Sequence, residues 1–272
     1  MAKNLIYQYW SGNPPPEAAQ SRKLIGEWAE RIGAEHMFEM NPVFQNVPGG
    51  KLTIPHYYTA FRPLFDPEFD EYDNILFLDC DIFPVRDLDI DIFAQGYKGI
   101  GIVDEPHKEK IHMTTKSHLN SANDEKWATM VKERWGKDVL RNNEGQVKIY
   151  NTGVVLYDRE ARKNAQENWL PFQTYIDWCN STPGLPTFYR IDQNYLIAMM
   201  LVSEYTVMDA GWNCFVHYNG DKDITGHRPV WDGRAQVEEP KLVHVQLRGA
   251  DDKNERWHDI IVNEPVEKWI DV

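Results

Sequence analysis

The sequence N-I-L-F-L-D-C-D, residues 74–81, places a run of apolar residues directly before two aspartates. An unbroken apolar run of this length is typical of a strand buried on both faces, as in a parallel sheet. Ionised carboxylates at the end of such a strand are costly unless a cation lies beside them. The i, i+2 spacing of Asp79 and Asp81 can aim both at one hard cation. We therefore expect a buried strand that ends at a metal site.

The D-x-D pattern alone is weak evidence for a metal site, so the residues around each match decide which one is the candidate. It occurs four times, at residues 79/81, 87/89, 89/91 and 221/223, where about two matches are expected by chance. Only the first follows an apolar strand, and it is followed in turn by I-F-P. Residues 87–91 are interpreted as a solvated acidic loop.

The rest of the chain alternates between strand and helix patterns. Further strands are expected at residues 4–9, 35–40, 97–103, 148–157 (interrupted at 151–153), 205–208 and 242–246, and helices at 17–32, 57–65, 124–135 and 192–202. This alternation predicts the α/β class, with an open, mostly parallel sheet flanked by helices. Ligands of such sheets bind beyond the carboxyl ends of the strands, where Asp79, Asp81 and Asp104 would lie.

The whole of 1–272 is expected to form a single domain. Its polar segment 105–147, interpreted as loop plus one helix, is the best candidate for a lid or an acceptor-side excursion.

Composition restricts the function. The 272 residues carry a net charge of −13, which disfavours nucleic acid as a partner. The three cysteines fit neither a disulfide framework nor a structural zinc site. No signal peptide or membrane span is indicated, so a soluble, cytoplasmic protein is expected. An acidic protein that binds a phosphate ester needs a divalent cation, a few basic residues, or both.

Several segments, in order, resemble one family. The stretch Y-D-N-I-L-F-L-D-C-D-I-F-P, residues 72–84, is similar to the D-x-D segment of GT-A glycosyltransferases, in particular family 8, the glycogenin and galactosyltransferase group. The other matching segments are residues 57–64 with Arg62, Y-N-T-G-V-V-L-Y at 150–157, Asp192-Gln193, Trp212-Asn213, and His244 followed by Gly249 and Lys253.

Two segments depart from that pattern. The opening I-Y-Q-Y-W-S-G-N-P-P-P, residues 6–16, resembles family 32 instead. Four residues separate His244 from Gly249, and no Pro-Trp follows Lys253.

The resemblance implies a GT-A, Rossmann-like fold with an open mixed sheet, and a set of site residues. Asp79, Asp81 and His244 would hold Mn²⁺ or Mg²⁺. Tyr7, Arg62 and Lys253 would join the two aspartates in binding the donor. The sugar and its reactive face would be lined by Asp104, Asn151, Asp192 and Gln193.

The implied reaction transfers a hexose, with retention of anomeric configuration, from a nucleotide-diphosphate sugar to a glycan or glycoprotein acceptor. A UDP-sugar is the favoured donor and a GDP-sugar the second choice. Neither the acceptor's identity nor the oligomeric state follows from the sequence.

Simpler interpretations remain open for individual residues. His244 could be a core histidine and Lys253 a solvated turn residue. Arg62 could pair with Asp66. Residues 151–153 could form a bulge, and Asp192 could be a helix N-cap.

Other functions remain open as well. A phosphatase of the haloacid dehalogenase type also places D-x-D after a strand, but its usual Ser or Thr and Lys partners are missing. A sugar-nucleotide pyrophosphorylase would need a Gly-rich loop where S-G-N-P stands at residues 11–14. A non-catalytic glycan-binding module would explain the ten Trp residues but not the buried carboxylates.

Overall fold

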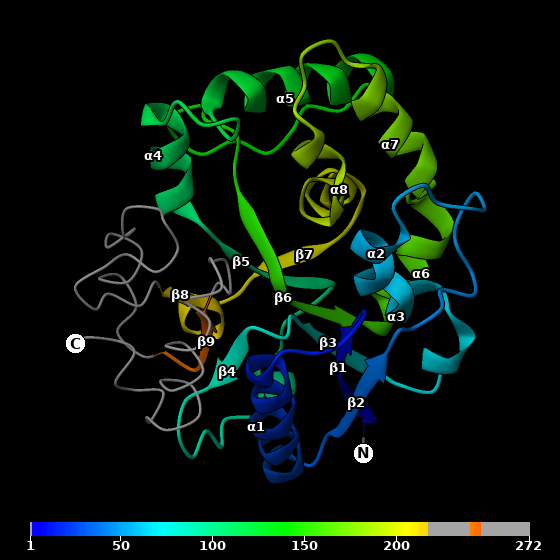
Figure 1. Ribbon diagram of the computed structural model, residues 1–272, viewed down its shortest axis with the longest axis vertical. Coiled ribbons are helices and arrows are strands. Elements are labelled where there is room, and N and C mark those ends of the chain that lie inside the picture. Colours follow the sequence, from blue (N-terminus) through cyan, green and yellow to red (C-terminus); the bar gives the residue numbers. More distant parts are fainter. Residues whose placement is uncertain (1, 217–239, 246–272) are drawn as a thin grey trace.

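The chain is organised around a mixed β-sheet. The computed structural model describes residues 2–216 and 240–245. Within these, six strands form one sheet in the order β2-β1-β3-β6-β5-β7, and three short strands form a second in the order β4-β9-β8 (Figure 1). The strands are β1 Asn4–Trp10, β2 Glu35–Met40, β3 Asn74–Leu78, β4 Ile82–Pro84, β5 Ile100–Asp104, β6 Tyr150–Asp158, β7 Tyr205–Val207, β8 Cys214–Val216 and β9 Leu242–Val245.

Helices flank the large sheet. They are α1 Pro16–Ile32, α2 Pro55–Tyr58, α3 Arg62–Phe65, α4 Pro106–Thr114, α5 Ser121–Trp135, α6 Arg159–Asn168, α7 Phe172–Ser181 and α8 Asp192–Met199. Short 3-10 turns span Thr59–Phe61, Pro67–Phe69, Ile92–Gln95, Thr187–Arg190, Met200–Val202 and Ala210–Asn213. No helix in the described part of the chain is long and apolar enough to cross a membrane.

The strand directions confirm the predicted open, mostly parallel arrangement. β1 is parallel to both β2 and β3, and β5 is parallel to β7. β6 runs antiparallel to its neighbours β3 and β5 and is the exception in the sheet. The small sheet was not predicted.

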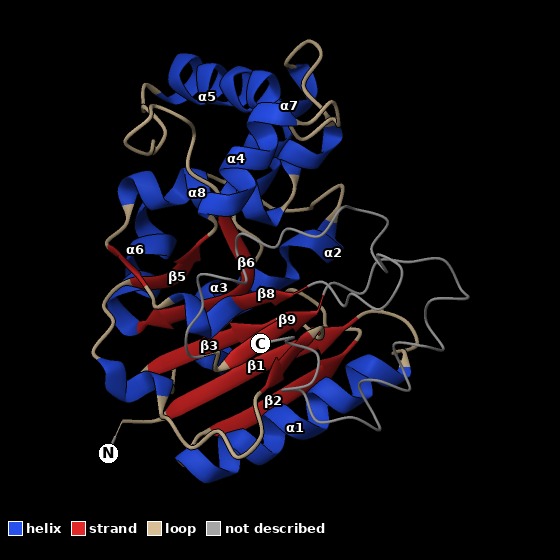
Figure 2. Cartoon of the chain, turned by 90° about the vertical axis from the view of Figure 1, so that its left-hand side faces the viewer, coloured by secondary structure: helices blue, strands red, loops and turns tan. Residues whose placement is uncertain are grey.

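Burial on both faces explains the unbroken apolar run that precedes the aspartates. Ile75 and Phe77 of β3 point into one core cluster, whereas Leu76 and Leu78 point into another. Trp28 of α1 lies in the second cluster, and Figure 2 shows α1 lying along the corresponding side of the strands. The residues of α6, α7 and α8 that are buried in the core belong to the first cluster. A strand buried on both faces cannot alternate polar and apolar residues.

Several predicted boundaries were wrong. The helix expected at 57–65 is broken into α2, a 3-10 turn and α3, and Pro63 lies in the first turn of α3, where its missing N–H is tolerated. The strand expected from residue 97 begins only at Ile100. Gly99 has φ +69°, and a Cβ there would lie 2.2 Å from the carbonyl oxygen of Glu204. This close approach requires glycine.

The segment 105–147 contains two helices rather than one, α4 and α5. Trp127 of α5 is fully buried, and its indole N–H donates a 2.8 Å hydrogen bond to the Tyr175 hydroxyl on α7. The α5 part of this segment is therefore anchored in the main core.

Candidate active site

The D-x-D segment connects the two sheets. β3 ends at Leu78, Asp79-Cys80-Asp81 follow, and β4 begins at Ile82 in the small sheet. The Asp79 N–H donates to the Gly153 carbonyl of β6 (2.8 Å), and the Gln8 amide of β1 donates to the Asp79 carbonyl (3.3 Å). The backbone that carries the first carboxylate is thus held by both neighbouring strands.

His244 reaches the aspartates through β9. That strand is antiparallel to β4, and Ile82 pairs with His244. β9 thus pairs with β4, the short strand that follows the aspartates, and not with β3. Ligand atoms of Asp79, Asp81 and His244 lie within 4.8 Å of one another, and His244 Nε2 lies 3.4 Å from Asp81 Oδ1.

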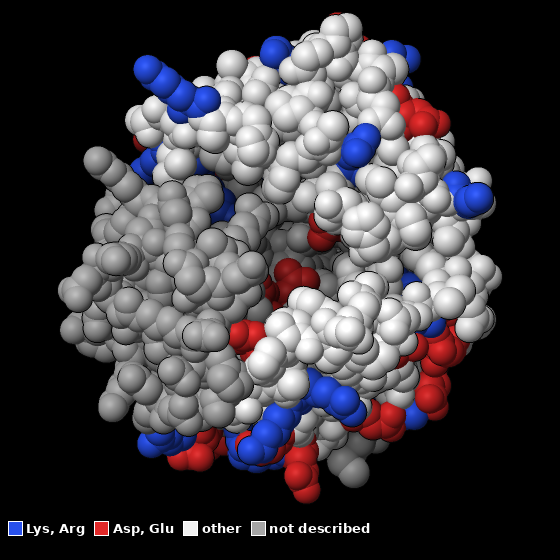
Figure 3. Space-filling view, viewed as in Figure 1, with Lys and Arg blue, Asp and Glu red and all other residues white. Residues whose placement is uncertain are grey.

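The electrostatics of Asp79, Asp81 and His244 favour a bound cation. Burial raises the pKa of Asp79 well above its usual range, and the charges of Asp81 and Asp192 raise it further. Asp81 Oδ1 is buried and accepts no hydrogen bond from any described residue. Figure 3 shows acidic side chains at the bottom of a hollow on this face of the molecule. Two carboxylates and an imidazole at this spacing fit a divalent ion, whose charge would remove both penalties.

A bulge in β6 brings further polar groups to the site. The β5–β6 register jumps from Ile102–Val155 to Val103–Asn151, which leaves the intervening residues of β6 unpaired with β5. The Gly153 N–H donates to Asn151 Oδ1 (2.7 Å). The bulge therefore spans residues 152–154 and overlaps the one considered at 151–153, and its Gly153 lies beside Asp79.

Gly153 is required at this position by close packing. A Cβ there would lie 2.8 Å from Asn151 Oδ1, 2.9 Å from His244 Cε1 and 3.1 Å from Asp79 Oδ2. Separations below 3.0 Å are not tolerated, so any side chain at 153 would displace the predicted metal-binding group.

Asp192 lies beside the bulge. The Thr152 hydroxyl donates to Asp192 Oδ2 (3.1 Å). Asp192 is the first residue of α8, and Ile191 takes the N-cap position, so the N-cap interpretation was wrong. Burial raises the pKa of Asp192 to about 6, while hydrogen bonds from Thr152 and from backbone N–H groups lower it. Asp192 is therefore mostly ionised at neutral pH.

This raised pKa predicts a stability change. Between the ordinary carboxyl pKa of 3.8 and about 6, folded metal-free protein binds a proton that the unfolded chain has lost. The stabilisation is complete below pH 4 and is lost as pH rises through 6, with an upper limit of about 3 kcal/mol. Asp192→Asn should lack this loss and be more stable than wild type at pH 7. Urea unfolding from pH 4 to 8 measures the difference.

Thr152→Val provides the comparison. It removes a hydrogen bond that lowers the Asp192 pKa, so that pKa should be higher in the variant. The fall in stability with rising pH should therefore continue to a higher pH than in wild type. Identical pH profiles for wild type and Asp192→Asn would contradict the assignment.

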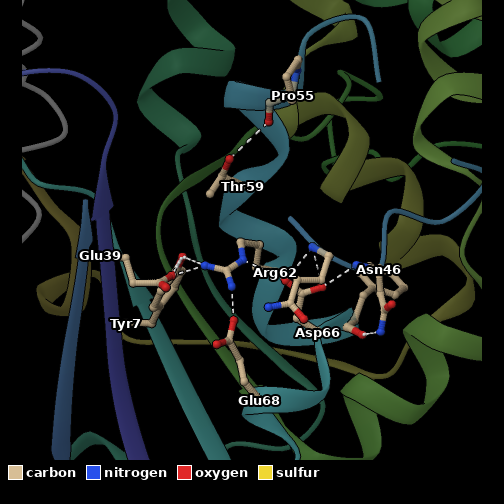
Figure 4. A network of polar contacts seen from close by, with 10 residues as sticks. Tyr7, Glu39, Asn46, Pro55, Thr59, Arg62, Asp66 and Glu68 are labelled. Carbon is tan, nitrogen blue, oxygen red and sulfur yellow. Dashed lines mark hydrogen bonds and ion pairs between the residues drawn. The ribbon is translucent and has the colours of Figure 1, made fainter. Parts of the chain in front are cut away.

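Arg62 and Tyr7 form a separate, buried network (Figure 4). The Arg62 side chain is 2% exposed and forms ion pairs with Glu39, Asp66 (2.8 Å) and Glu68. The Tyr7 hydroxyl donates to Glu39 (2.7 Å) and lies 3.4 Å from Arg62 Nη1. The pairing with Asp66 that we had considered is therefore present. Donor binding by Tyr7 and Arg62 stays a prediction.

The remaining predicted residues differ in their surroundings. Asp104, the last residue of β5, forms an ion pair with Lys148 (2.5 Å). Gln193 follows Asp192 on α8 and is half-buried. Lys253 lies outside the described residues.

Two residues near the site were not among the predicted site residues. Asn213 donates to Asn151 Oδ1 (3.0 Å), and its own Oδ1 lies 3.1 Å from His244 Nδ1. The Trp212-Asn213 pair was the available sequence signal. Burial raises the pKa of Tyr9, and the charges of the nearby Asp192 and Asp79 raise it further. Tyr9 had no distinguishing signal, because it lies within an apolar strand.

Comparison with known proteins identifies the class. Residues 55–244 match the profile described as Glycosyl transferase family 8. An active-site mutant of LgtC is 15% identical, with a TM-score of 0.50 and coverage of 97% of this chain and 98% of that one. The galactosyltransferase LgtC with donor and acceptor sugar analogs is 14% identical (TM-score 0.49, coverage 97% and 98%). A glycosyltransferase involved in glycosylation of the major capsid of PBCV-1 is 14% identical (TM-score 0.47, coverage 93% and 98%).

No curated protein matches the chain significantly. The match to the family profile covers more than half of the chain, so the chain belongs to glycosyl transferase family 8 and is a glycosyltransferase, with a sugar donor and an acceptor. The fold is that of the GT-A-like neighbours. The likeness of the opening segment to family 32 is not shown by these comparisons.

Proposed function

We propose that this glycosyltransferase is metal-dependent and transfers a hexose from a nucleotide-diphosphate sugar, with a UDP-sugar favoured over a GDP-sugar. The observation that carries the proposal is the convergence of Asp79, Asp81 and His244 on one point, with a buried Asp81 oxygen that lacks a hydrogen bond among the described residues. Such an oxygen is costly unless a cation binds there.

The three side chains would hold Mn²⁺ or Mg²⁺ at the carboxyl end of β3. A divalent ion there supplies charge that neutralises the departing nucleoside diphosphate, which needs no proton donor. The β6 bulge positions Asn151 beside this group, and Thr152 holds Asp192. We assign the sugar and its reactive face to Asn151, Asp192, Gln193 and Asp104.

Retention of anomeric configuration is part of the proposal. Asp192 is the further carboxylate whose charge acts on Asp79, and it is mostly ionised at neutral pH. A same-face reaction, in which the leaving phosphate helps to deprotonate the acceptor hydroxyl, needs no protein nucleophile. Asp192 would then act on the sugar through its charge.

The substrate-binding roles of Tyr7, Arg62 and Lys253 belong to the same proposal. The acceptor is expected to be a glycan or glycoprotein that approaches past the segment 105–147. Since α5 is anchored in the core, α4 is the part of this segment that we assign to the acceptor side.

A donor screen tests the proposal. The protein incubated with UDP-glucose, UDP-galactose or GDP-mannose and Mn²⁺ should release nucleoside diphosphate from at least one donor, and EDTA should abolish the release. Undiminished release in EDTA would contradict metal dependence. NMR of the first-formed glycoside should show an α-linkage from an α-linked donor, whereas a β-linked product would contradict retention.

A further inference from the structure

Asn213 links the bulge of β6 to His244. It ends the 3-10 turn Ala210–Asn213, directly before β8, and is 6% exposed. Its side chain lies between Asn151 on β6 and His244 on β9, within hydrogen-bond distance of both. A buried amide with two partners has a defined orientation if one of the partners is fixed.

The backbone of Gly153 fixes that orientation. A backbone N–H can only donate, so the Asn151 atom that it contacts at 2.7 Å must be the oxygen. The Asn213 atom that lies 3.0 Å from this oxygen must then be the amide nitrogen. The Asn213 oxygen therefore faces His244, and Nδ1 of the ring must donate to it across 3.1 Å.

The reverse arrangement is unfavourable. If His244 Nδ1 were an acceptor, Asn213 would turn its nitrogen toward the ring and its oxygen toward the Asn151 oxygen. Turning Asn151 as well would place its NH₂ group against the Gly153 N–H. Either change places two donors or two acceptors against each other in a buried position, and each group left without a hydrogen bond destabilises the fold.

We infer that Asn213 is a positioning residue that holds His244 in the tautomer with its proton on Nδ1, so that the Nε2 lone pair faces the predicted cation position. Nε2 lies on the side of Asp81, at 3.4 Å, which is longer than an ordinary N–H···O hydrogen bond. A neutral imidazole ligates through its unprotonated nitrogen, and the hydrogen bond of the other nitrogen decides which one that is. The consequence for metal binding rests on the proposed function.

The tautomer can be measured in metal-free protein without any sugar substrate. ¹⁵N-histidine labelling and NMR at alkaline pH distinguish protonated Nδ1 from protonated Nε2. The chain has nine histidines, so His244→Gln serves to assign the signal. We expect wild type to show the Nδ1–H form. A predominantly Nε2–H ring in wild type would overturn the inference.

Two variants separate positioning from packing. Asn213→Leu keeps the branched shape of the side chain but has no acceptor, so it should lose the Nδ1–H preference. Asn213→Asp keeps an acceptor toward the ring and should retain that preference, although it loses the bond to Asn151 and should therefore lower the melting temperature. Melting temperatures of both report packing independently. If the leucine variant fails to fold, the wild-type and aspartate spectra decide, and loss of the Nδ1–H form in Asn213→Asp overturns the inference.

Metal affinity supplies the second readout. Electron paramagnetic resonance of free Mn²⁺ should show that Asn213→Leu weakens binding by about 10- to 100-fold, and Asn213→Asp by less. A lowered melting temperature with unchanged Mn²⁺ affinity would make Asn213 merely structural and overturn the inference. Absence of Mn²⁺ binding in wild type would instead contradict the proposed function, while the metal-free spectra still test the tautomer.

Discussion

The Asp81→Asn variant should lose transfer activity almost completely while it stays folded. The amide has nearly the volume of the carboxylate but lacks the charge that a hard cation requires. The loss should exceed the roughly 10- to 100-fold that follows changes at residues that only support metal ligands. Initial rates at increasing Mn²⁺, together with the Mn²⁺ dissociation constant, measure the effect.

The same substitution should not destabilise the metal-free protein. The Asp81 charge raises the pKa of its half-buried neighbour Asp79, so its removal relieves a repulsion. Asp89→Asn is the matched control, because Asp89 lies in an exposed D-x-D pair outside the site. Equal activities of the two variants would show that the wrong acidic pair had been chosen.

Gly153→Ala should be nearly as damaging, although it removes no chemical group. The added methyl group would lie within 3.1 Å of Asn151, His244 and Asp79, so at least one of them must move. Displacement of reacting groups by about 1 Å can cost on the order of 100-fold in rate. We therefore expect a loss of about this size in turnover, with weaker Mn²⁺ binding in the same variant.

Gly26→Ala is the control for adding a methyl group. Gly26 lies in α1, and its Cβ would meet only the His36 ring, at 3.1 Å. That ring is linked to the site only through Gln8, which lies 3.1 Å from His36 Nε2 and bonds the Asp79 carbonyl. Alanine also favours a helix over glycine by about 1 kcal/mol. This variant should retain Mn²⁺ binding and turnover. Normal Mn²⁺ affinity in Gly153→Ala would show that the bulge does not position the site.

The sequence predicted the large sheet, and Asp79, Asp81 and His244 lie together as expected, while the roles of the site residues stay predictions. The apolar run before Asp79 and the acid pair after it are local features, and local patterns specify strand and site together. The convergence of Asp79, Asp81 and His244 followed from the family resemblance, since nothing near residue 244 indicates a metal ligand.

Features that depend on contacts between distant segments were missed. β4 and β8 have three residues each, too few for a periodic pattern. The Arg62 network brings together Glu39 of β2 and Glu68 of a later turn, and no spacing rule relates them. The Asn213 contacts depend on a hydrogen bond from the Gly153 backbone, which only the folded bulge reveals.

The pairing of β4 with β9 has a consequence for biosynthesis. Ile82 and His244 pair although they lie far apart in the sequence. β4 therefore cannot pair with β9 until the intervening residues have left the ribosome. Closing so long a loop costs entropy that only the later contacts repay, which places this event late in folding. The aspartates leave the ribosome well before the histidine does. A growing chain therefore exposes two carboxylates without their third partner, and the predicted cation position is completed only after residue 244 has been made.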